Sequence, residues 1–298
     1  MSVFEPIINN TALLYACTII LGLLVGSFLN VVIHRLPIML KKQWRKDCLL
    51  FLADNGDISA TANNTVEEKV NLFLPRSQCP HCGHAISAWE NIPVLSYLLL
   101  RGKCRYCNEP ISLRYPLVEL LSAIIALVIV LRFGPTLFSV MAIILSWALI
   151  CLSFIDYDHQ YLPDNITLPF LWLGLIVNLD GMFTNIESAL IGAMAGYTIL
   201  WTIYKLFKVA TGKEGMGYGD FKLLAMLGAW LGWQMLPAII LLSSLVGALV
   251  GISLVLSGRH ERGKPISFGP YLAMAGCLAL ISGDAINKLY LTWVGLAT

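Results

Sequence analysis

The chain has 298 residues, of which 57% are hydrophobic and 13% are charged, and its formal net charge is +2. Soluble globular chains carry about 25% charged residues, so this composition excludes a soluble protein and indicates one that lies largely in a lipid bilayer. The small net charge gives no indication of a nucleic acid as partner.

The first apolar stretch, residues 12–34, is predicted to be a transmembrane helix that is not cleaved. A spanning helix needs about 20 predominantly apolar residues, and this stretch provides them. A secretory signal would carry a basic segment ahead of its apolar run. The first basic residue of this chain is Arg35, which follows the run.

A polar stretch comes next, residues 36–113, and it holds two C-x-x-C pairs, Cys79 with Cys82 and Cys104 with Cys107. Two thiolates at this spacing bind one metal ion, and a second pair completes a tetrahedral zinc site. Because the stretch has no sustained apolar pattern, we expect a structural zinc ion to hold it together.

Thiol redox chemistry is the alternative, since residues 79–82 alone resemble an oxidoreductase site. A reducing cytoplasm disfavours disulfides, and a redox pair would not need the second C-x-x-C, so we favour zinc. His81 and His84 are candidate substitute ligands, which we interpret as bystanders. The remaining cysteines are interpreted as three small apolar residues and one free thiol: Cys17, Cys151 and Cys277, and Cys48.

Seven further apolar stretches follow the polar one. Five have the length of a spanning helix, while two are shorter and could instead be re-entrant or tilted. The five are residues 115–132, 137–155, 188–208, 235–257 and 267–283, and the two are 165–179 and 221–233. Together they predict an all-α polytopic membrane protein of about eight transmembrane helices, with a small zinc-binding domain inserted after the first.

The basic residues predict the orientation, because cytoplasmic loops of membrane proteins are enriched in Lys and Arg. If residues 36–113 are cytoplasmic and eight spans alternate, 18 of the 20 basic residues lie inside, and both termini lie outside. The inside set is Arg35, Lys41, Lys42, Arg45, Lys46, Lys69, Arg76, Arg101, Lys103, Arg105, Arg114, Lys205, Lys208, Lys213, Lys222, Arg259, Arg262 and Lys264. The outside set is Arg132 and Lys288.

This arrangement divides the chain into a first transmembrane helix at residues 1–35, a cytoplasmic zinc-binding insert at 36–113 and a transmembrane core at 114–298. Glycines spaced four residues apart predict close helix packing within the core. These pairs are Gly192 and Gly196, Gly228 and Gly232, and Gly247 and Gly251.

Two acidic clusters lie at cytoplasmic ends of predicted spans, where ionisable residues are costly and indicate function. Residues 155–164 contain Asp156, Asp158 and Asp164, and the second cluster centres on Asp220. Because both clusters fall at the same face of the bilayer, we expect Asp156 and Asp220 to meet. Two carboxylates at close range share a proton, so one can activate water while the other polarises a peptide carbonyl. The pattern therefore predicts aspartic protease chemistry.

Structural roles are the alternatives for these carboxylates. Asp220 and Asp164 could each cap the helix that follows, and Asp158 could be a solvated residue at the interface. For Asp164 we favour the cap, and we interpret His159 as an orienting or solvating residue and not as a metal ligand. A cap alone does not explain three glycines that would allow a substrate to approach the backbone ahead of Asp220. They are Gly215, Gly217 and Gly219.

In these motifs the chain resembles the type IV prepilin peptidases, the bifunctional leader peptidases and N-methyltransferases of bacterial pilus and type II secretion systems. The family's G-x-G-D element matches residues 217–220, and its D-x-D-H-x-x-L-P-D element matches 156–164. Its N-terminal motif resembles residues 26–37, and its cytoplasmic insert resembles the two C-x-x-C pairs and the run at 91–97.

The resemblance implies that Asp156 and Asp220 are the catalytic pair of an intramembrane aspartic endopeptidase. Its substrates would be prepilins and pseudopilins, cut after a glycine at the cytoplasmic face of the inner membrane so that a short basic leader is released. The new N-terminal residue, usually phenylalanine, would then be methylated from S-adenosyl-L-methionine, a second cofactor beside zinc. The resemblance ties this activity to the N-terminal motif and to the insert around Arg101, Gly102 and Lys103.

Two other classes of protein are alternatives. A proton-coupled transporter would carry acidic residues near mid-span and would show repeated halves, and the sequence shows neither. A membrane thiol oxidoreductase would centre on Cys79 and Cys82, and metal analysis would distinguish it from a zinc protein.

Overall fold

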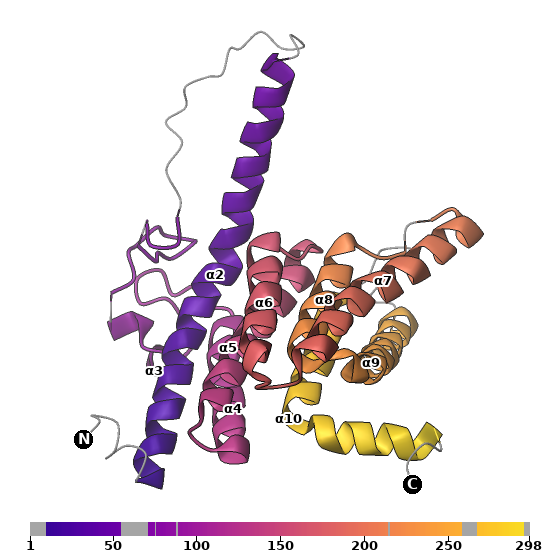
Figure 1. Ribbon diagram of the computed structural model, residues 1–298. Helices are drawn as coiled ribbons and strands as arrows, with labels where there is room; N and C mark the ends of the chain where they lie inside the picture. The colour runs from indigo at the N-terminus through magenta and orange to yellow at the C-terminus, as the bar shows by residue number, and fades with distance from the viewer. Residues whose placement is uncertain are drawn as a thin grey trace. The chain divides into compact units, whose positions relative to one another are not determined.

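The computed structural model describes residues 10–54, 71–74, 76–87, 89–213, 215–257 and 267–294, with side chains described up to residue 283 except that of Asn91. The chain divides into two compact units, Met1–Ile124 and Ile125–Thr298, which are treated separately below. The described residues form helices joined by turns, and their only β-structure is two isolated bridges (Figure 1). The predicted all-α fold class is confirmed.

The first unit begins with α2 (Thr11–Asp54), a helix far longer than the apolar stretch that predicted it. At about 1.5 Å per residue its 44 residues extend for roughly 65 Å, about twice the hydrocarbon thickness of a bilayer. The helix passes through Pro37 and continues over the basic run at residues 41–46 (Figure 1). The domain boundary predicted at residue 35 is therefore not the end of this helix.

Small residues bring α2 against the first half of α4 (Arg114–Phe133). A Cβ at Gly22 would lie 2.5 Å from the Cα of Ala123, and one at Gly26 would lie 2.6 Å from the Cα of Glu119. The hydroxyl of Ser122 donates to the C=O of Gly22 at 2.8 Å. Such close approach of backbones is typical of helix pairs in membranes. The predicted glycine pairs did not include Gly22 and Gly26, although they have the same spacing.

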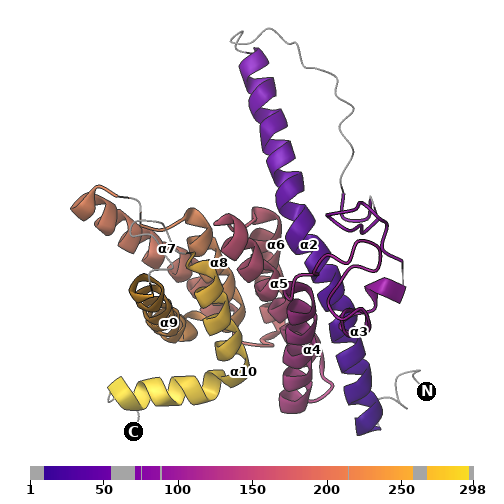
Figure 2. The same ribbon diagram turned by 180° about the vertical axis from the view of Figure 1, so that it is seen from behind.

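The second unit contains the end of α4 and six more helices, α5 (Leu137–His159), α6 (Asp164–Val177), α7 (Ile186–Thr211), α8 (Tyr218–Leu231), α9 (Leu236–Leu256) and α10 (Gly269–Val294). The short helix α8 packs against α6, α7 and α10 (Figures 1 and 2). Its residues 223–230 are all buried. A helix that is apolar and enclosed on all sides belongs to a core, so α8 is the centre of this unit.

Three of the six glycines in the predicted pairs, Gly192, Gly196 and Gly228, take part in the packing of α7 on α8. A Cβ at Gly196 would lie 2.6 Å from the C=O oxygen of Leu224, and Gly192 faces the backbone of Gly228. Gly232 has a different role from the one predicted, because it ends α8 with a positive φ of +83°. Gly247 packs against the ring of Tyr271 on α10.

All eight predicted spans coincide with helices, but the helices differ in length. Among the described residues, five helices are long and apolar enough to cross a membrane: α2, α4, α5, α7 and the segment Trp233–Leu256. The helices α6 and α8 have 14 residues each, and α10 kinks at Ser282 after the short apolar segment Gly269–Gly283. The protein is thus a multi-pass membrane protein, and eight complete crossings remain a prediction.

A buried asparagine connects the turn after α6 to the end of α8. The amide nitrogen of Asn178 donates to the C=O groups of Ala229 and Trp230, at 2.9 and 3.0 Å. Its oxygen accepts the N–H groups of Phe183 and Thr184. Because every buried polar atom of this side chain is satisfied, Asn178 stabilises the core.

Candidate active site and metal centre

The four predicted zinc ligands lie together in the first unit. The Sγ atoms of Cys79, Cys82, Cys104 and Cys107 are all within 4.8 Å of one another, and those of Cys79 and Cys107 are 3.8 Å apart. Four sulfurs at zinc-bonding distance in a tetrahedron lie about 3.8 Å apart. The cluster therefore has the size and the donor set of a structural zinc site.

Two similar turns hold these cysteines. The N–H of Gly83 donates to the C=O of Cys79 at 2.9 Å, and the N–H of Asn108 donates to the C=O of Cys104 at 3.0 Å. Gly83 and Asn108 both have left-handed backbones, with φ of +69° and +59°. The β-bridges Gln78–Ala85 and Lys103–Pro110 close the two loops. Turns of this kind bring the two thiols of a pair close enough to bind one metal ion.

The two histidines near the first pair lie outside the cysteine cluster in the described part of the chain. The ring of His84 stacks on Tyr106 with the ring centroids 3.4 Å apart, in keeping with the predicted bystander role. Backbone N–H groups of Cys82 and His81 lower the pKa of the Cys79 thiol to about 7. The lowered value favours the thiolate of Cys79, which is the form that binds a metal, whereas desolvation and the neighbouring thiols raise the pKa of Cys107.

A buried carboxylate anchors the segment that leads to the second pair of cysteines. Glu119 on α4 accepts the N–H of Val94 at 2.8 Å, and Ser27 on α2 hydrogen-bonds to the same carboxyl group. Val94 has a positive φ of +57° and precedes the short helix α3 (Leu95–Leu99). Glu119 thereby fixes a strained residue at the point where α3 begins.

The predicted methyl-transfer residues lie in a tight turn after α3. Arg101 and Gly102 both have positive φ, at +53° and +68°. A Cβ at Gly102 would also lie 2.8 Å from the phenol oxygen of Tyr97. Gly102 is therefore required by the backbone and by the space available, whereas Lys103 is exposed and free of this constraint.

The two predicted catalytic carboxylates belong to the second unit. Asp156 lies in the last turn of α5 and Asp220 in the first turn of α8, and only 5% and 7% of their surfaces are exposed. They are close enough for the charge of Asp156 to act on Asp220. Among the described residues, neither carboxylate forms an ion pair with Lys or Arg.

The loop after α5 and the glycines before α8 bring the two aspartates together. Gln160 ends α5 in a left-handed conformation, and its N–H donates to the C=O of Asp156 at 2.8 Å. The chain then places Leu162 against α8, where a Cβ at Gly219 would lie 2.9 Å from the Cβ of Leu162. Close approach of this loop to α8 thus depends on glycine at position 219.

Asp220 does not occupy the capping position of α8. The residue there is Gly217, which has no side chain, and Asp220 lies three positions later. Its carboxylate does receive the N–H of Gly217, so it also contributes to the start of the helix. This contact is compatible with a second, chemical role.

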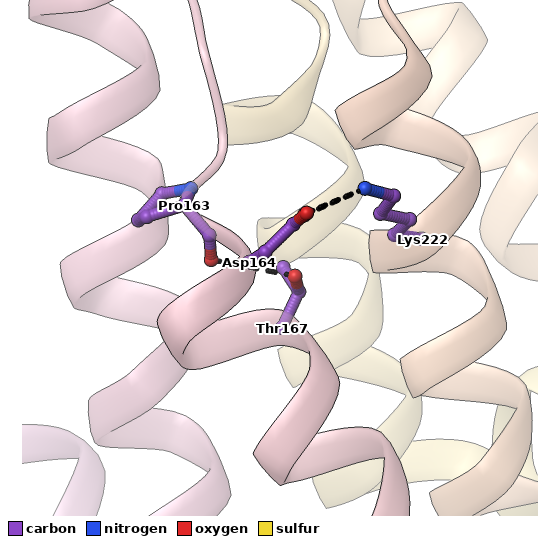
Figure 3. Close-up of polar contacts among 4 residues, drawn as sticks. All are labelled: Pro163, Asp164, Thr167 and Lys222. Carbon is purple, nitrogen blue, oxygen red and sulfur yellow. Dashed lines mark hydrogen bonds and ion pairs between the residues drawn. The ribbon is translucent and has the colours of Figure 1, made fainter. Parts of the chain in front are cut away.

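The predicted cap at Asp164 is wrong. Pro163 occupies the capping position of α6, and Thr167 donates to the C=O of Pro163 at 3.3 Å. The carboxylate of Asp164 instead forms an ion pair with Lys222, with both oxygens 2.7 Å from Nζ (Figure 3). An oppositely charged partner from α8 has replaced the local hydrogen bond that the sequence suggested.

Two neighbours of Asp156 in the sequence, Asp158 and His159, are less buried than the aspartate itself. Asp158 is exposed, in keeping with a solvated residue at the interface. The ring of His159 lies 6.1 Å from that of Tyr161, measured between centroids.

A contact that the sequence did not predict reaches Asp156 from α10. The N–H of Gly269 donates to Oδ2 of Asp156 at 3.1 Å, and the hydroxyl of Ser267 donates to its C=O at 2.8 Å. The only signal in the sequence is Pro270 after Gly269, because proline is common in the first turn of a helix.

Comparisons with known proteins cover both units. The family described as "Bacterial Peptidase A24 N-terminal domain" matches residues 20–133, and the "Type IV leader peptidase family" matches residues 143–252. The chain belongs to the type IV leader peptidase family. The predicted resemblance is thereby confirmed. The leader peptidase match contains Asp156 and Asp220, and the N-terminal match contains the cysteine cluster.

Curated relatives of this family are similar over nearly the whole chain, and three of them carry the name "Prepilin leader peptidase/N-methyltransferase". The one from Aeromonas hydrophila is 54% identical over 280 residues, 94% of either chain. That from Stutzerimonas stutzeri is 52% identical over 296 residues, 99% of this chain and 100% of its own. That from Pseudomonas aeruginosa is 53% identical over 279 residues, 94% of either chain. No solved structure matches.

The alternative classes find no support in this family. Its relatives are named as peptidases and methyltransferases, not as transporters or oxidoreductases. The four thiols also converge on one point, as metal ligands do, and are not divided into a redox pair and a separate group.

Proposed function

We propose that the protein cleaves the leader peptide from type IV prepilins and pseudopilins and N-methylates the new N-terminal residue. The observation that carries the first activity is the pair of buried carboxylates, Asp156 from α5 and Asp220 from α8, within electrostatic reach of each other. The names of the relatives support both activities.

The aspartate pair can hydrolyse a peptide bond with one shared proton. The ionised carboxylate takes a proton from a water molecule, whose oxygen attacks the carbonyl carbon of the scissile bond. The protonated carboxylate gives its proton to the carbonyl oxygen, which stabilises the tetrahedral intermediate. Collapse of that intermediate breaks the C–N bond: the carboxyl group that accepted the water proton passes it to the leaving amine, and a hydroxyl group of the intermediate returns its proton to the other carboxylate.

The cysteine cluster would hold a structural zinc ion, with Cys79, Cys82, Cys104 and Cys107 as its ligands. Such an ion contributes directly to the folding of a small polar domain. S-adenosyl-L-methionine, when bound, would supply the methyl group. Gly102 and Lys103 are the residues we assign to that region, with Gly102 shaping the turn and Lys103 exposed on it.

The protein would lie in the inner membrane with the insert and the aspartates at the cytoplasmic face and both termini in the periplasm. The distribution of basic residues supports this orientation. A prepilin carries its basic leader on the same side, so the leader and the bilayer are the partners that this orientation requires.

The decisive experiment is incubation of the purified protein with a prepilin, followed by mass spectrometry. Cleavage would remove the mass of the leader, and methylation would add one methyl group to the product when S-adenosyl-L-methionine is present. No loss of the leader at any enzyme concentration would refute the protease assignment.

A further inference from the structure

Two residues at the start of α10 contact Asp156: Gly269 in its first turn contacts the side chain, and Ser267, two positions before it, contacts the backbone. Gly269 donates its N–H to Oδ2 at 3.1 Å, and Ser267 donates its hydroxyl to the backbone carbonyl oxygen at 2.8 Å. That carbonyl oxygen also accepts the N–H of Gln160. The end of α5, which carries the carboxylate, is therefore held by a helix more than a hundred residues later in the sequence.

Gly269 is required by the space beside the carboxylate. A Cβ at this position would lie 2.6 Å from Oδ2 of Asp156 and 3.3 Å from Cδ1 of Leu162. Asp156 is buried and Leu162 is packed into the hydrophobic core, so neither side chain has free space to move into. Any side chain at position 269 would displace the carboxylate.

The N–H of Gly269 is also the donor that the helix leaves available. Tyr271 and Leu272 direct their N–H groups to the C=O of Phe268, and Pro270 has no N–H. The first N–H groups of a helix have no partner within it and carry partial positive charge. A carboxylate placed against Gly269 satisfies such a group.

We propose that Ser267 and Gly269 are positioning residues of the aspartate site, and that the first turn of α10 is a third element which fixes Asp156 relative to Asp220. The inference rests on the proposed protease function. It concerns residues beyond position 252, where the match to the leader peptidase family ends.

Ser267 has a second neighbour that the experiment must take into account. Together with residues of α9 and α10 it lines a cavity of about 260 Å³, formed by Ser244, Gly247, Ala248, Ser267, Phe268 and Tyr271. A substitution at Ser267 changes the wall of this cavity as well as the contact with Asp156. Ala248 lines the same cavity from α9, so it provides the matched control.

The test is the rate of prepilin cleavage by the full-length protein. Gly269→Ala should lower kcat roughly 100-fold, because a misplacement of a reacting group by about 1 Å costs that much. Its KM should change by less than about twofold, since substrate binding is not altered. Gly276→Ala is the control for strain on the same helix, because its Cβ would crowd the buried side chain of Leu227 on α8 and not Asp156. It should keep kcat within about threefold of the parent, a change of less than one kcal/mol in the barrier.

Variants of Ser267 test the hydroxyl without adding bulk beside the carboxylate. Ser267→Thr retains the donor and should retain activity. Ser267→Val has nearly the shape of threonine but no donor, and it should lower kcat about tenfold, the value of one hydrogen bond. Ala248→Val should leave kcat unchanged.

Three results would overturn the inference: full kcat in Gly269→Ala, an equal loss in Gly276→Ala, or equal activity of the Thr and Val variants at position 267. A rise in KM with unchanged kcat would also overturn it. Asp156→Asn in the same assay separates this failure from that of the proposed function. If Asp156→Asn is inactive while Gly269→Ala is fully active, only the positioning role is lost. If Asp156→Asn itself cleaves, the aspartate mechanism is lost.

Discussion

Lys222 on α8 forms an ion pair with Asp164 at the start of α6, with Nζ 2.7 Å from both carboxylate oxygens (Figure 3). Lys222 lies two residues after Asp220, and Asp164 closes the segment that begins at Asp156. The pair therefore joins the two segments that carry the candidate catalytic carboxylates. Its side chains are 29% and 51% exposed, so water screens the attraction.

The ion pair predicts coupled effects on cleavage. Asp164→Asn and Lys222→Gln should each lower kcat by only about two- to fivefold, because a partly exposed pair contributes up to about 1 kcal/mol. The double variant should be no worse than either single one, since both remove the same interaction. Kinetics of the four proteins would measure this coupling. If the kcat losses of the two single variants multiply in the double variant, the two residues act independently.

The cysteine cluster predicts one tightly bound zinc ion per protein molecule. Ser in place of any one of the four clustered cysteines should lower zinc content and protein yield, because zinc contributes to folding of the insert. Cys48→Ser is the matched control, since Cys48 is an exposed thiol on α2 outside the cluster. Elemental analysis of the detergent-purified protein measures its zinc content. A zinc-free protein with the four thiols oxidised in pairs would contradict the assignment.

Cleavage and methylation are predicted to be separable. Lys103→Ala should lower methylation at least about tenfold, the loss expected when one charged contact of about 1.5 kcal/mol is removed, and it should leave cleavage and zinc content unchanged. Gly102→Ala tests the backbone instead, because it introduces strain at a φ of +68° and crowds Tyr97. Gly83→Ala is the comparison for backbone strain alone. Gly83 has nearly the same positive φ, in the turn of the first cysteine pair, but an added Cβ would meet no atom within 4 Å. Equal loss of both activities in Lys103→Ala would contradict separate sites.

The short helix α6 gives a test of topology. If α6 crosses from the cytoplasmic face, the exposed turn after it at Gly181 lies outside, and α7 then returns the chain to the inside at Gly212. An impermeant thiol reagent added from outside should label a cysteine at position 181 and leave one at position 212 unlabelled. The reverse pattern would refute the orientation predicted from the basic residues.

The sequence predicted the features that depend on composition and short spacing. Apolar runs located the eight longer helices of the described residues but not the short α3, and C-x-x-C spacing located the cysteine cluster. It failed where distant segments decide the outcome. The apolar run that predicted the first helix ends at residue 34, yet α2 continues to Asp54. The partner of Asp164 comes from another helix, and the N–H that reaches Asp156 is a backbone group, which the sequence marks only by Pro270 after Gly269.

The strongest prediction concerns the two buried aspartates. Asp156→Asn and Asp220→Asn should each abolish cleavage while zinc content and membrane insertion stay intact. Asparagine keeps the size and most of the hydrogen bonds, so a residue that only starts a helix would tolerate it. A pair that shares a proton would not, because the amide can neither accept the proton of water nor donate the shared one. The double variant should be as inactive as either single variant, since the pair acts as one unit.

The pH dependence of cleavage provides an independent check on the same pair. The profile should be bell-shaped, because the reaction needs one carboxylate ionised and the other protonated. The two apparent pKa values that the limbs of this profile report belong to the pair of carboxylates and not to either residue alone. Asp158→Asn is the matched control, since this exposed neighbour should leave both the rate and the profile unchanged. If Asp220→Asn cleaves at nearly the parental rate, Asp220 serves α8 alone and the two-carboxylate mechanism fails.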